Sequence, residues 1–181
     1  MQPLTCKLLS LLLHYPDEQL LLHCRAVRSA ADTLQPGDSF RTALEAFAAF
    51  LEGRPLIDLQ VDYTAHFDLG AATTLNLVHH LDLAPHARGG LLSRLQGVYL
   101  SAGLKTIGEA PDYLPLLLEY LWLHPAGWDQ APLRETLAAV PKLLAGIEAV
   151  QPAYAALLKP MVGALERRGI LSSPEVSRDP L

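Results

Sequence analysis

The chain has 181 residues, of which 50% are hydrophobic and 18% are charged, and its formal net charge is −5. This composition excludes global disorder, because enough apolar side chains are present to form a core. The acidic balance argues against a nucleic-acid-binding protein, which usually carries a basic patch.

Apolar residues recur at helical spacing along the whole chain, and no run alternates as a strand would. The first helix is predicted to end at His14 and Tyr15, because Pro16 follows. Asp17 is the predicted N-cap of a second helix that runs to about residue 34. Further helices are expected over residues 39–53, 55–67, 73–83 and 88–105.

The most apolar stretch runs from Leu114 to Leu123, where only Pro115 and Glu119 are not apolar. A helix that is apolar nearly all round belongs in the centre of a bundle. We expect Asp112 to be its N-cap, which places Pro115 in the first turn, where proline is tolerated. Asp112 and Glu119 would then lie on nearly one face and, with Glu109, form an acidic line along the helix.

The C-terminal part is predicted to contain a helix over residues 132–150 and a last helix over 152–168. Pro141 should kink the first of these or split it in two, and Pro160 should kink the second. Residues 172–181 have no periodicity, and we expect a disordered tail there. The chain is therefore predicted to be all-α, with one domain over residues 1–171 folded as a bundle of eight or nine helices.

The N-terminus carries no basic residue before its first apolar run, so we expect no secretory signal. No apolar stretch reaches the roughly 20 residues that span a bilayer. The two cysteines, Cys6 and Cys24, lie on predicted apolar faces and are expected to be buried thiols in a reducing compartment. These features predict a cytoplasmic protein that does not insert into a membrane.

The sequence contains no nucleophile motif, no phosphate-binding loop and no zinc-protease motif. Asp58, Asp62 and His66 share one helix face at four-residue spacing. That face would allow an all-α metal-dependent enzyme as an alternative, although a solvated polar face is far more common. The larger aromatic residues are expected mostly in the core: Tyr63, Phe67, Tyr99, Tyr113, Tyr120 and Trp122.

Five segments occur in the order and at the spacing of a known family: Leu11–Asp17, Tyr63–Gly70, Thr74–His80, Ala87–Gly89 and Glu109–Tyr120. They resemble the NarJ-type nitrate reductase assembly chaperones, which belong with the TorD-like maturation chaperones of molybdenum enzymes. The Glu-x-Pro-Asp run of the last segment is the most specific part of the match.

The resemblance implies an all-α cytoplasmic chaperone that is not an enzyme and binds no cofactor tightly. The implied partner is the N-terminal segment of the nitrate reductase catalytic (alpha) subunit, a client that receives the molybdenum cofactor before it docks at the membrane. The resemblance also allows a contact with the cofactor-insertion machinery. A TorD-like proofreading chaperone for another exported molybdenum enzyme remains an alternative.

In such a chaperone, an apolar groove between helices would bind an amphipathic client segment, and flanking acids would meet its basic residues. By match to the motifs, the residues expected at this groove are Tyr63, Phe67, Asp68, His80, Glu109, Pro111, Asp112, Tyr113, Leu117, Glu119 and Tyr120.

Overall fold

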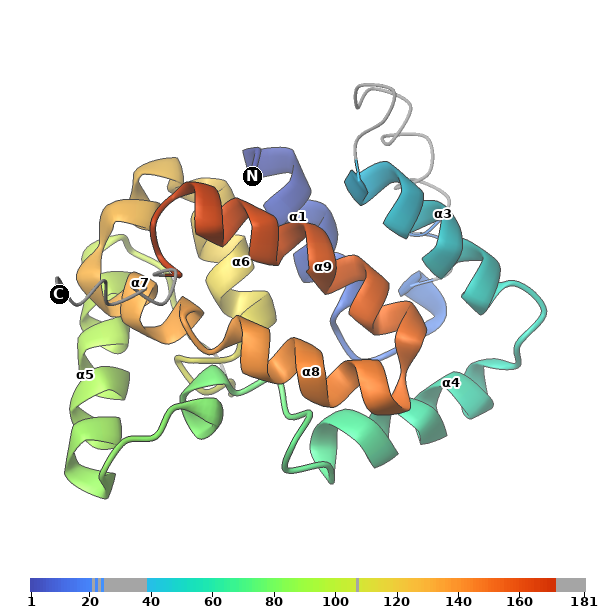
Figure 1. Ribbon diagram of the computed structural model, residues 1–181, viewed down its shortest axis with the longest axis horizontal. Coiled ribbons are helices and arrows are strands. Elements are labelled where there is room, and N and C mark those ends of the chain that lie inside the picture. The colour runs from blue at the N-terminus through green and yellow to red at the C-terminus, as the bar shows by residue number, and fades with distance from the viewer. Residues whose placement is uncertain (21, 23, 25–38, 107, 172–181) are drawn as a thin grey trace, which may run out of the picture.

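The computed structural model describes residues 1–20, 22, 24, 39–106 and 108–171. Within these ranges the chain forms one all-α domain with eight α-helices and no strand, which confirms the predicted fold class (Figure 1). The α-helices are α1 (Pro3–Leu12), α3 (Ser39–Leu51), α4 (Leu56–Tyr63), α5 (Pro85–Ser101), α6 (Leu114–Leu123), α7 (Ala131–Leu137), α8 (Val140–Val150) and α9 (Pro152–Arg167). A π-helical turn, η1 (Thr64–Asp68), and two 3-10 turns, η2 (Leu77–His80) and η3 (Pro125–Asp129), complete them.

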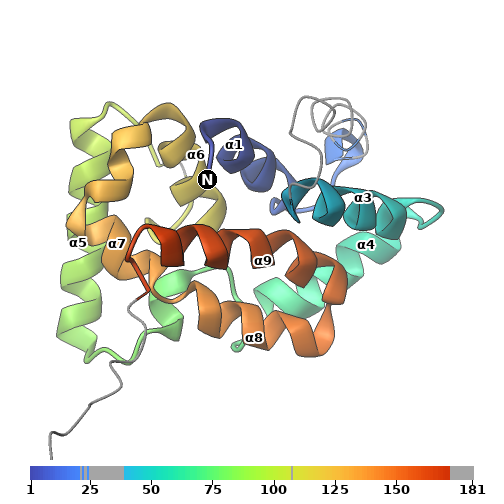
Figure 2. The same ribbon diagram turned by 45° about the horizontal axis from the view of Figure 1, so that its top comes forward.

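The core is built by helices that are distant in sequence. α1 packs along α6, α3 packs on α9, and α8 runs beside α9 (Figures 1 and 2). α6 occupies the position predicted for the most apolar helix, with Leu117, Leu118 and Leu121 fully buried. α5 and α4 lie at opposite ends of the bundle.

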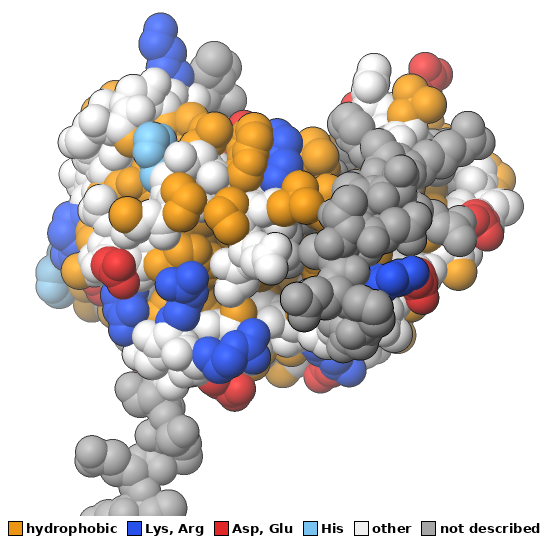
Figure 3. Space-filling model, turned by 90° about the horizontal axis from the view of Figure 1, so that it is seen from above, with side chains coloured by type: hydrophobic (Ala, Val, Ile, Leu, Met, Phe, Trp, Pro, Cys, Tyr) orange, Lys and Arg blue, Asp and Glu red, His pale blue; other side chains and the backbone are white. Residues whose placement is uncertain are grey.

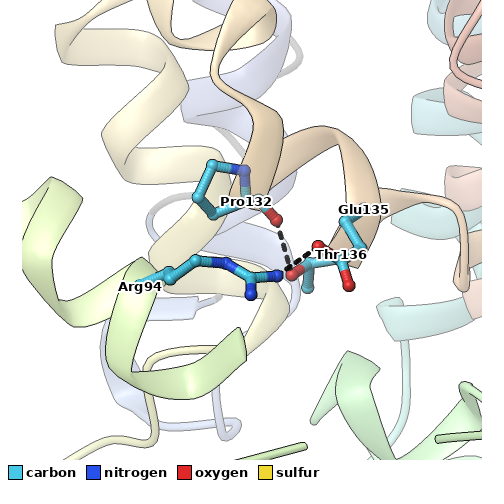
Figure 4. A network of polar contacts seen from close by, with 4 residues as sticks. All are labelled: Arg94, Pro132, Glu135 and Thr136. Atoms are coloured by element: carbon cyan, nitrogen blue, oxygen red, sulfur yellow. Dashed lines mark hydrogen bonds and ion pairs between the residues drawn. The ribbon is translucent and has the colours of Figure 1, made fainter. Parts of the chain in front are cut away.

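An exposed ion pair joins α7 to α5, and a hydrogen bond within α7 lies beside it (Figure 4). The guanidinium of Arg94 on α5 pairs with the carboxylate of Glu135 on α7. The hydroxyl of Thr136 donates to the carbonyl of Pro132, 2.8 Å away, within α7. Because Arg94 and Glu135 are both exposed, their ion pair contributes only about 0–1 kcal/mol to the free energy of unfolding.

Prolines mark several helix boundaries, as the sequence indicates. Pro141 lies in the first turn of α8, and the predicted helix over residues 132–150 is split into α7 and α8. Pro152 likewise lies in the first turn of α9, while Pro160 lies inside it. The Asp17 carboxylate accepts the backbone N–H of Leu20 at 2.9 Å, so the predicted cap is confirmed. Most of the helix that Asp17 begins, and the tail at 172–181, fall outside the described residues.

Three predictions of local structure are wrong. α1 ends at Leu12 rather than at His14 and Tyr15. α5 begins at Pro85 and ends at Ser101, instead of covering residues 88–105. Residues 73–83 contain only the short turn η2, because the segment before it is bonded to the loop preceding α6: the N–H of Leu114 donates to the carbonyl of Leu75 at 2.9 Å.

Both cysteines are buried, as predicted: Cys6 is 0% and Cys24 is 8% exposed. Burial raises the pKa of the Cys6 thiol to about 11, so this side chain stays protonated at neutral pH. Of the aromatic residues expected in the core, Tyr63, Phe67, Tyr99 and Tyr120 are buried, while Tyr113 and Trp122 are partly buried.

The surface viewed from above carries many hydrophobic side chains, with lysine and arginine side chains among them (Figure 3). A cation–π contact joins α1 to α6: the Lys7 ammonium lies 4.1 Å from the ring centroid of Trp122. Among the described residues, none of the helices combines the length and the hydropathy that a membrane span requires.

Candidate functional site

A cavity of about 320 Å³ opens where four separate segments of the chain meet. α4 and η1 form one wall, the segment before η2 forms another, and the loop before α6 and the turn after α1 complete it. The lining residues are Tyr15, Tyr63, Phe67, Asp68, Thr74, Leu75, Asn76, Glu109 and Tyr113.

Two tyrosine hydroxyls join the walls. The hydroxyl of Tyr63 donates to the carbonyl of Leu13 at 2.8 Å and lies 3.2 Å from the hydroxyl of Tyr113. Since Tyr63 has one proton to give, Tyr113 must donate within this pair. Burial raises the pKa of both phenols, so both stay protonated. The ring of Tyr15 packs edge-on against Tyr63, with centroids 5.5 Å apart.

The π-helical turn η1 presents Phe67 and Asp68 to the cavity. Its hydrogen bond from the N–H of Leu69 to the carbonyl of Thr64 spans five residues and widens the turn. The hydroxyl of Thr73 donates to the carbonyl of His66, and a Cβ at Gly70 would overlap that same carbonyl. Glycine at 70 therefore lets the chain fold back closely beneath η1.

Asp112 holds the loop before α6 in place. Its carboxylate accepts the N–H of Val78 at 2.9 Å, and its backbone carbonyl accepts the N–H of Leu77 at 3.1 Å. The hydroxyl of Tyr99 donates to the carbonyl of Pro111 at 2.8 Å in the same loop. Asp112 is only 4% exposed, and burial raises its pKa although the bond from Val78 lowers it.

The prediction that Asp112 caps α6 is therefore wrong. Tyr113 is the N-cap residue, no side chain caps the helix, and Pro115 lies in its second position. Because Asp112 lies outside the helix and is buried, the predicted acidic line loses its middle member. Glu109 and Glu119 still share a neighbour, His14: partial burial lowers the pKa of His14, and both carboxylates oppose that shift.

His80 supports the second wall. Its Nε2 lies 2.8 Å from the carbonyl of Thr74, a lining residue, so this nitrogen must carry the proton. His80 is 5% exposed, and burial lowers its pKa, which favours the neutral ring. His80 thus positions the wall and does not line the cavity itself.

The structure brings together five of the eleven residues expected at a groove: Tyr63, Phe67, Asp68, Glu109 and Tyr113. Leu117 and Tyr120 are buried on α6, where Tyr120 packs on Tyr99 with ring centroids 5.3 Å apart. Glu119 is half-buried on α6 outside the lining. The others outside it are His80, Pro111 and Asp112. Client binding stays a prediction for all eleven residues.

Sequence reasoning missed four lining residues: Tyr15, Thr74, Leu75 and Asn76. All four lie in the segments that carry the family resemblance, so the motifs contained the signal. Thr74, Leu75 and Asn76 escaped notice because a helix over residues 73–83, as predicted, would not pair them with Tyr113, whereas the observed isolated bridge pairs Asn76 with Tyr113.

The polar face of α4 does not assemble into a metal site. The carboxylate of Asp62 pairs with Arg54 at 2.5 Å, while Asp58 is exposed. In the part of the chain that the structure describes, no three histidine, cysteine or acidic side chains come together where they could hold a metal ion.

The chemistry of the lining favours binding of a cationic, partly apolar group. Asp68 and Glu109 supply two carboxylates, and no lysine or arginine is among the nine lining residues. Tyr63, Phe67 and Tyr15 add aromatic surface, which packs on apolar chains and on cations.

Comparison with known proteins identifies the family of the chain. A family model described as "Nitrate reductase delta subunit" matches residues 35–165. The chain is 37% identical over 140 residues to the probable nitrate reductase molybdenum cofactor assembly chaperone NarW of Escherichia coli K12, covering 77% of this chain and 56% of the relative. It is 32% identical over 154 residues to NarJ of the same strain, a nitrate reductase molybdenum cofactor assembly chaperone, covering 83% and 64%.

A third relative, the probable nitrate reductase molybdenum cofactor assembly chaperone NarJ of Bacillus subtilis, is 30% identical over 176 residues. That match covers 95% of this chain and 94% of the relative, whereas the chain spans less than two thirds of either Escherichia coli protein. From the family model and these relatives together, the chain belongs to the nitrate reductase delta subunit family.

Proposed function

We propose that this protein is a cytoplasmic assembly chaperone that binds the N-terminal segment of a respiratory nitrate reductase catalytic subunit. It holds the subunit while the molybdenum cofactor is inserted and releases it for assembly at the membrane. It performs no chemistry of its own, and the cofactor belongs to the client. Family membership and the names of the relatives support this proposal.

The observation that carries the proposal is the acidic, aromatic cavity, whose lining residues lie in the segments that resemble the chaperone family. Tyr63, Phe67 and Tyr113 provide rings, and Asp68 and Glu109 provide charge at one opening. An amphipathic segment with basic residues matches both features, because its apolar side chains lose water while its cations meet carboxylates. The hydrogen bonds from Leu13 through Tyr63 to Tyr113 fix the rings of Tyr63 and Tyr113 before any ligand arrives.

Isothermal titration with a peptide of the first residues of the cognate catalytic subunit, about fifteen residues or four helical turns, tests the proposal. We expect micromolar or tighter binding with a negative heat-capacity change, the mark of apolar burial. The double variant Asp68→Asn with Glu109→Gln should weaken binding several-fold, because each rim charge contributes about 0.2–1 kcal/mol.

The matched control is Asp129→Asn with Glu166→Gln, which removes two exposed carboxylates outside the cavity. This variant should bind the peptide as the wild type does. A folded wild-type protein that binds no peptide would contradict the proposed function. Equal weakening by both double variants would instead assign the effect to net charge rather than to the cavity.

A further inference from the structure

Four apolar residues lie exposed along α4 and the turn after it. Ile57 is 62%, Val61 is 60% and Leu69 is 78% exposed, and Ala65 is exposed as well. We refer to these four residues as the α4 stripe. Large aliphatic side chains scattered singly are ordinary on protein surfaces, but a contiguous row commonly marks an interaction site.

The π-helical turn keeps the stripe straight. Residues four apart on an α-helix drift about 40° around the axis per step. Between Val61 and Leu69 the chain passes through η1, whose i→i+5 bonding takes more residues per turn and reverses that drift. The stripe thus follows one side of the element, about 18 Å long at 1.5 Å per residue.

The core does not use this side. Leu59, Tyr63 and Phe67 make up the buried face of the same element, each 2–3% exposed. Serine at Ile57 or Val61 would therefore leave the interior of the bundle unchanged.

The charged residues closest to the stripe in sequence are mostly acidic. Asp58 and Asp68 are exposed next to it, and Asp62 is paired with Arg54. No lysine or arginine occurs between Arg54 and Arg88, a stretch that contains α4, η1 and η2.

We propose that the α4 stripe is a docking surface for a basic amphipathic helix of a partner protein. Such a helix would place aliphatic side chains, at three- and four-residue spacing, against Ile57, Val61 and Leu69. Its lysine or arginine residues would flank that row and meet Asp58 and Asp68. A second copy of this chain fits poorly, because its own stripe would bring acids against acids.

None of the four stripe residues lines the cavity, although Asp68, which does, lies next to Leu69, and the proposal does not depend on the proposed client. The probe is a labelled designed peptide of about 18 residues, five helical turns, with leucines on one face and lysines elsewhere. Fluorescence anisotropy measures its Kd for the full chain at low and high salt. Two comparison peptides have the same leucines with glutamates, or the same composition in scrambled order.

The test variant is Ile57→Ser with Val61→Ser, and the matched control is Leu100→Ser with Val150→Ser, two exposed aliphatic residues elsewhere. We expect the test variant to weaken binding of the amphipathic lysine peptide at least about tenfold, since two aliphatic contacts are lost. The control variant should stay within about twofold, a spread well under 1 kcal/mol.

Circular dichroism and thermal melting of each variant verify that the fold is intact. Unchanged binding by the test variant, equal weakening by the control variant, or equal affinity for the scrambled peptide would each overturn the proposal. So would a wild-type dimer in sedimentation equilibrium that the test variant converts to a monomer, because the occupant would then be a second copy.

Discussion

At the residue scale, Asp112 shows how a buried carboxylate can hold a cavity wall in place without lining the cavity. Asp112 is buried between η2 and the loop before α6, and its carboxylate accepts a hydrogen bond from the backbone N–H of Val78 on η2. Val78 is itself 3% exposed, so its N–H has no access to water if the carboxylate is removed. The loop it secures carries Glu109 and Tyr113 into the cavity wall.

Asp112→Ala should lower the free energy of unfolding by about 1–3 kcal/mol, because a buried N–H loses its acceptor. Asp112→Asn keeps an acceptor oxygen and removes the buried charge, so at pH 7 it should be as stable as the wild type or more stable. Denaturant titration of the three proteins measures the difference. Equal destabilisation by alanine and asparagine would contradict the assigned hydrogen bond.

The same carboxyl gives a pH dependence with a defined sign. Burial raises the pKa of Asp112 above its ordinary value of 3.8, so the folded state binds this proton more tightly than the unfolded state. The stability of the wild type relative to Asp112→Asn should therefore fall as the pH rises above 3.8 and level off once the folded-state pKa is passed. Unfolding curves between pH 4 and pH 7 measure this trend, and a rising difference would refute it.

At the element scale, the predictable features were those set by local chemistry. Pro141 splits a helix and Asp17 caps one, because proline lacks an N–H and a carboxylate accepts free N–H groups in any context. The failures depend on distant partners. Residues 74–76 do not form the predicted helix, because this segment hydrogen-bonds to the backbone of the loop before α6. Asp112 accepts the N–H of Val78 instead of capping α6. Spacing along the chain encodes neither of these long-range contacts.

The candidate site shows the same division. Tyr63, Phe67 and Asp68 lie within one short element, so their motif was enough to place them together. Leu117 and Tyr120 share a motif with Glu109 but face the core from α6, since a helix that is apolar all round gives no sign of which side meets a ligand.

The contact between α8 and the turn before the cavity gives an element-scale prediction. A Cβ at Gly146 on α8 would overlap the carbonyl of Ala72, whereas a Cβ at Gly97 on α5 would meet nothing within 4 Å. Gly97→Ala should therefore stabilise the protein by about 0.5–1 kcal/mol, the usual gain in a helix interior. Gly146→Ala should destabilise it by about 1–3 kcal/mol, because the turn must shift.

Thermal unfolding of the two variants measures whether each substitution raises or lowers the stability of the protein. Because the turn at Ala72 leads into Thr74 and Asn76, Gly146→Ala should also weaken peptide binding, while Gly97→Ala should not. Stabilisation by both substitutions would mean that α8 and this turn are not in close contact in solution.

At the scale of the whole molecule, charge is distributed unevenly around the bundle. The net charge of −5 arises partly from a stretch between Arg54 and Arg88 that has acids but no lysine or arginine. Residues of this stretch and Glu109 contribute to the lining of the cavity, which is formed by four segments of the chain. A basic client segment would be attracted toward that side before any contact is made.

Association of the client peptide should therefore slow as salt is added, while its dissociation changes little. Screening over about 10 Å at 0.1 M salt removes long-range attraction but leaves apolar contacts intact. Stopped-flow measurements at several salt concentrations should give a several-fold fall in the association rate constant. The variant Glu109→Gln with Glu119→Gln should reduce the slope of that salt dependence, because it removes two of the carboxylates expected to meet basic residues of the client. If this variant keeps the wild-type slope, the two acids form an ordinary solvated surface, and attraction of the client must come from other carboxylates such as Asp58 and Asp68.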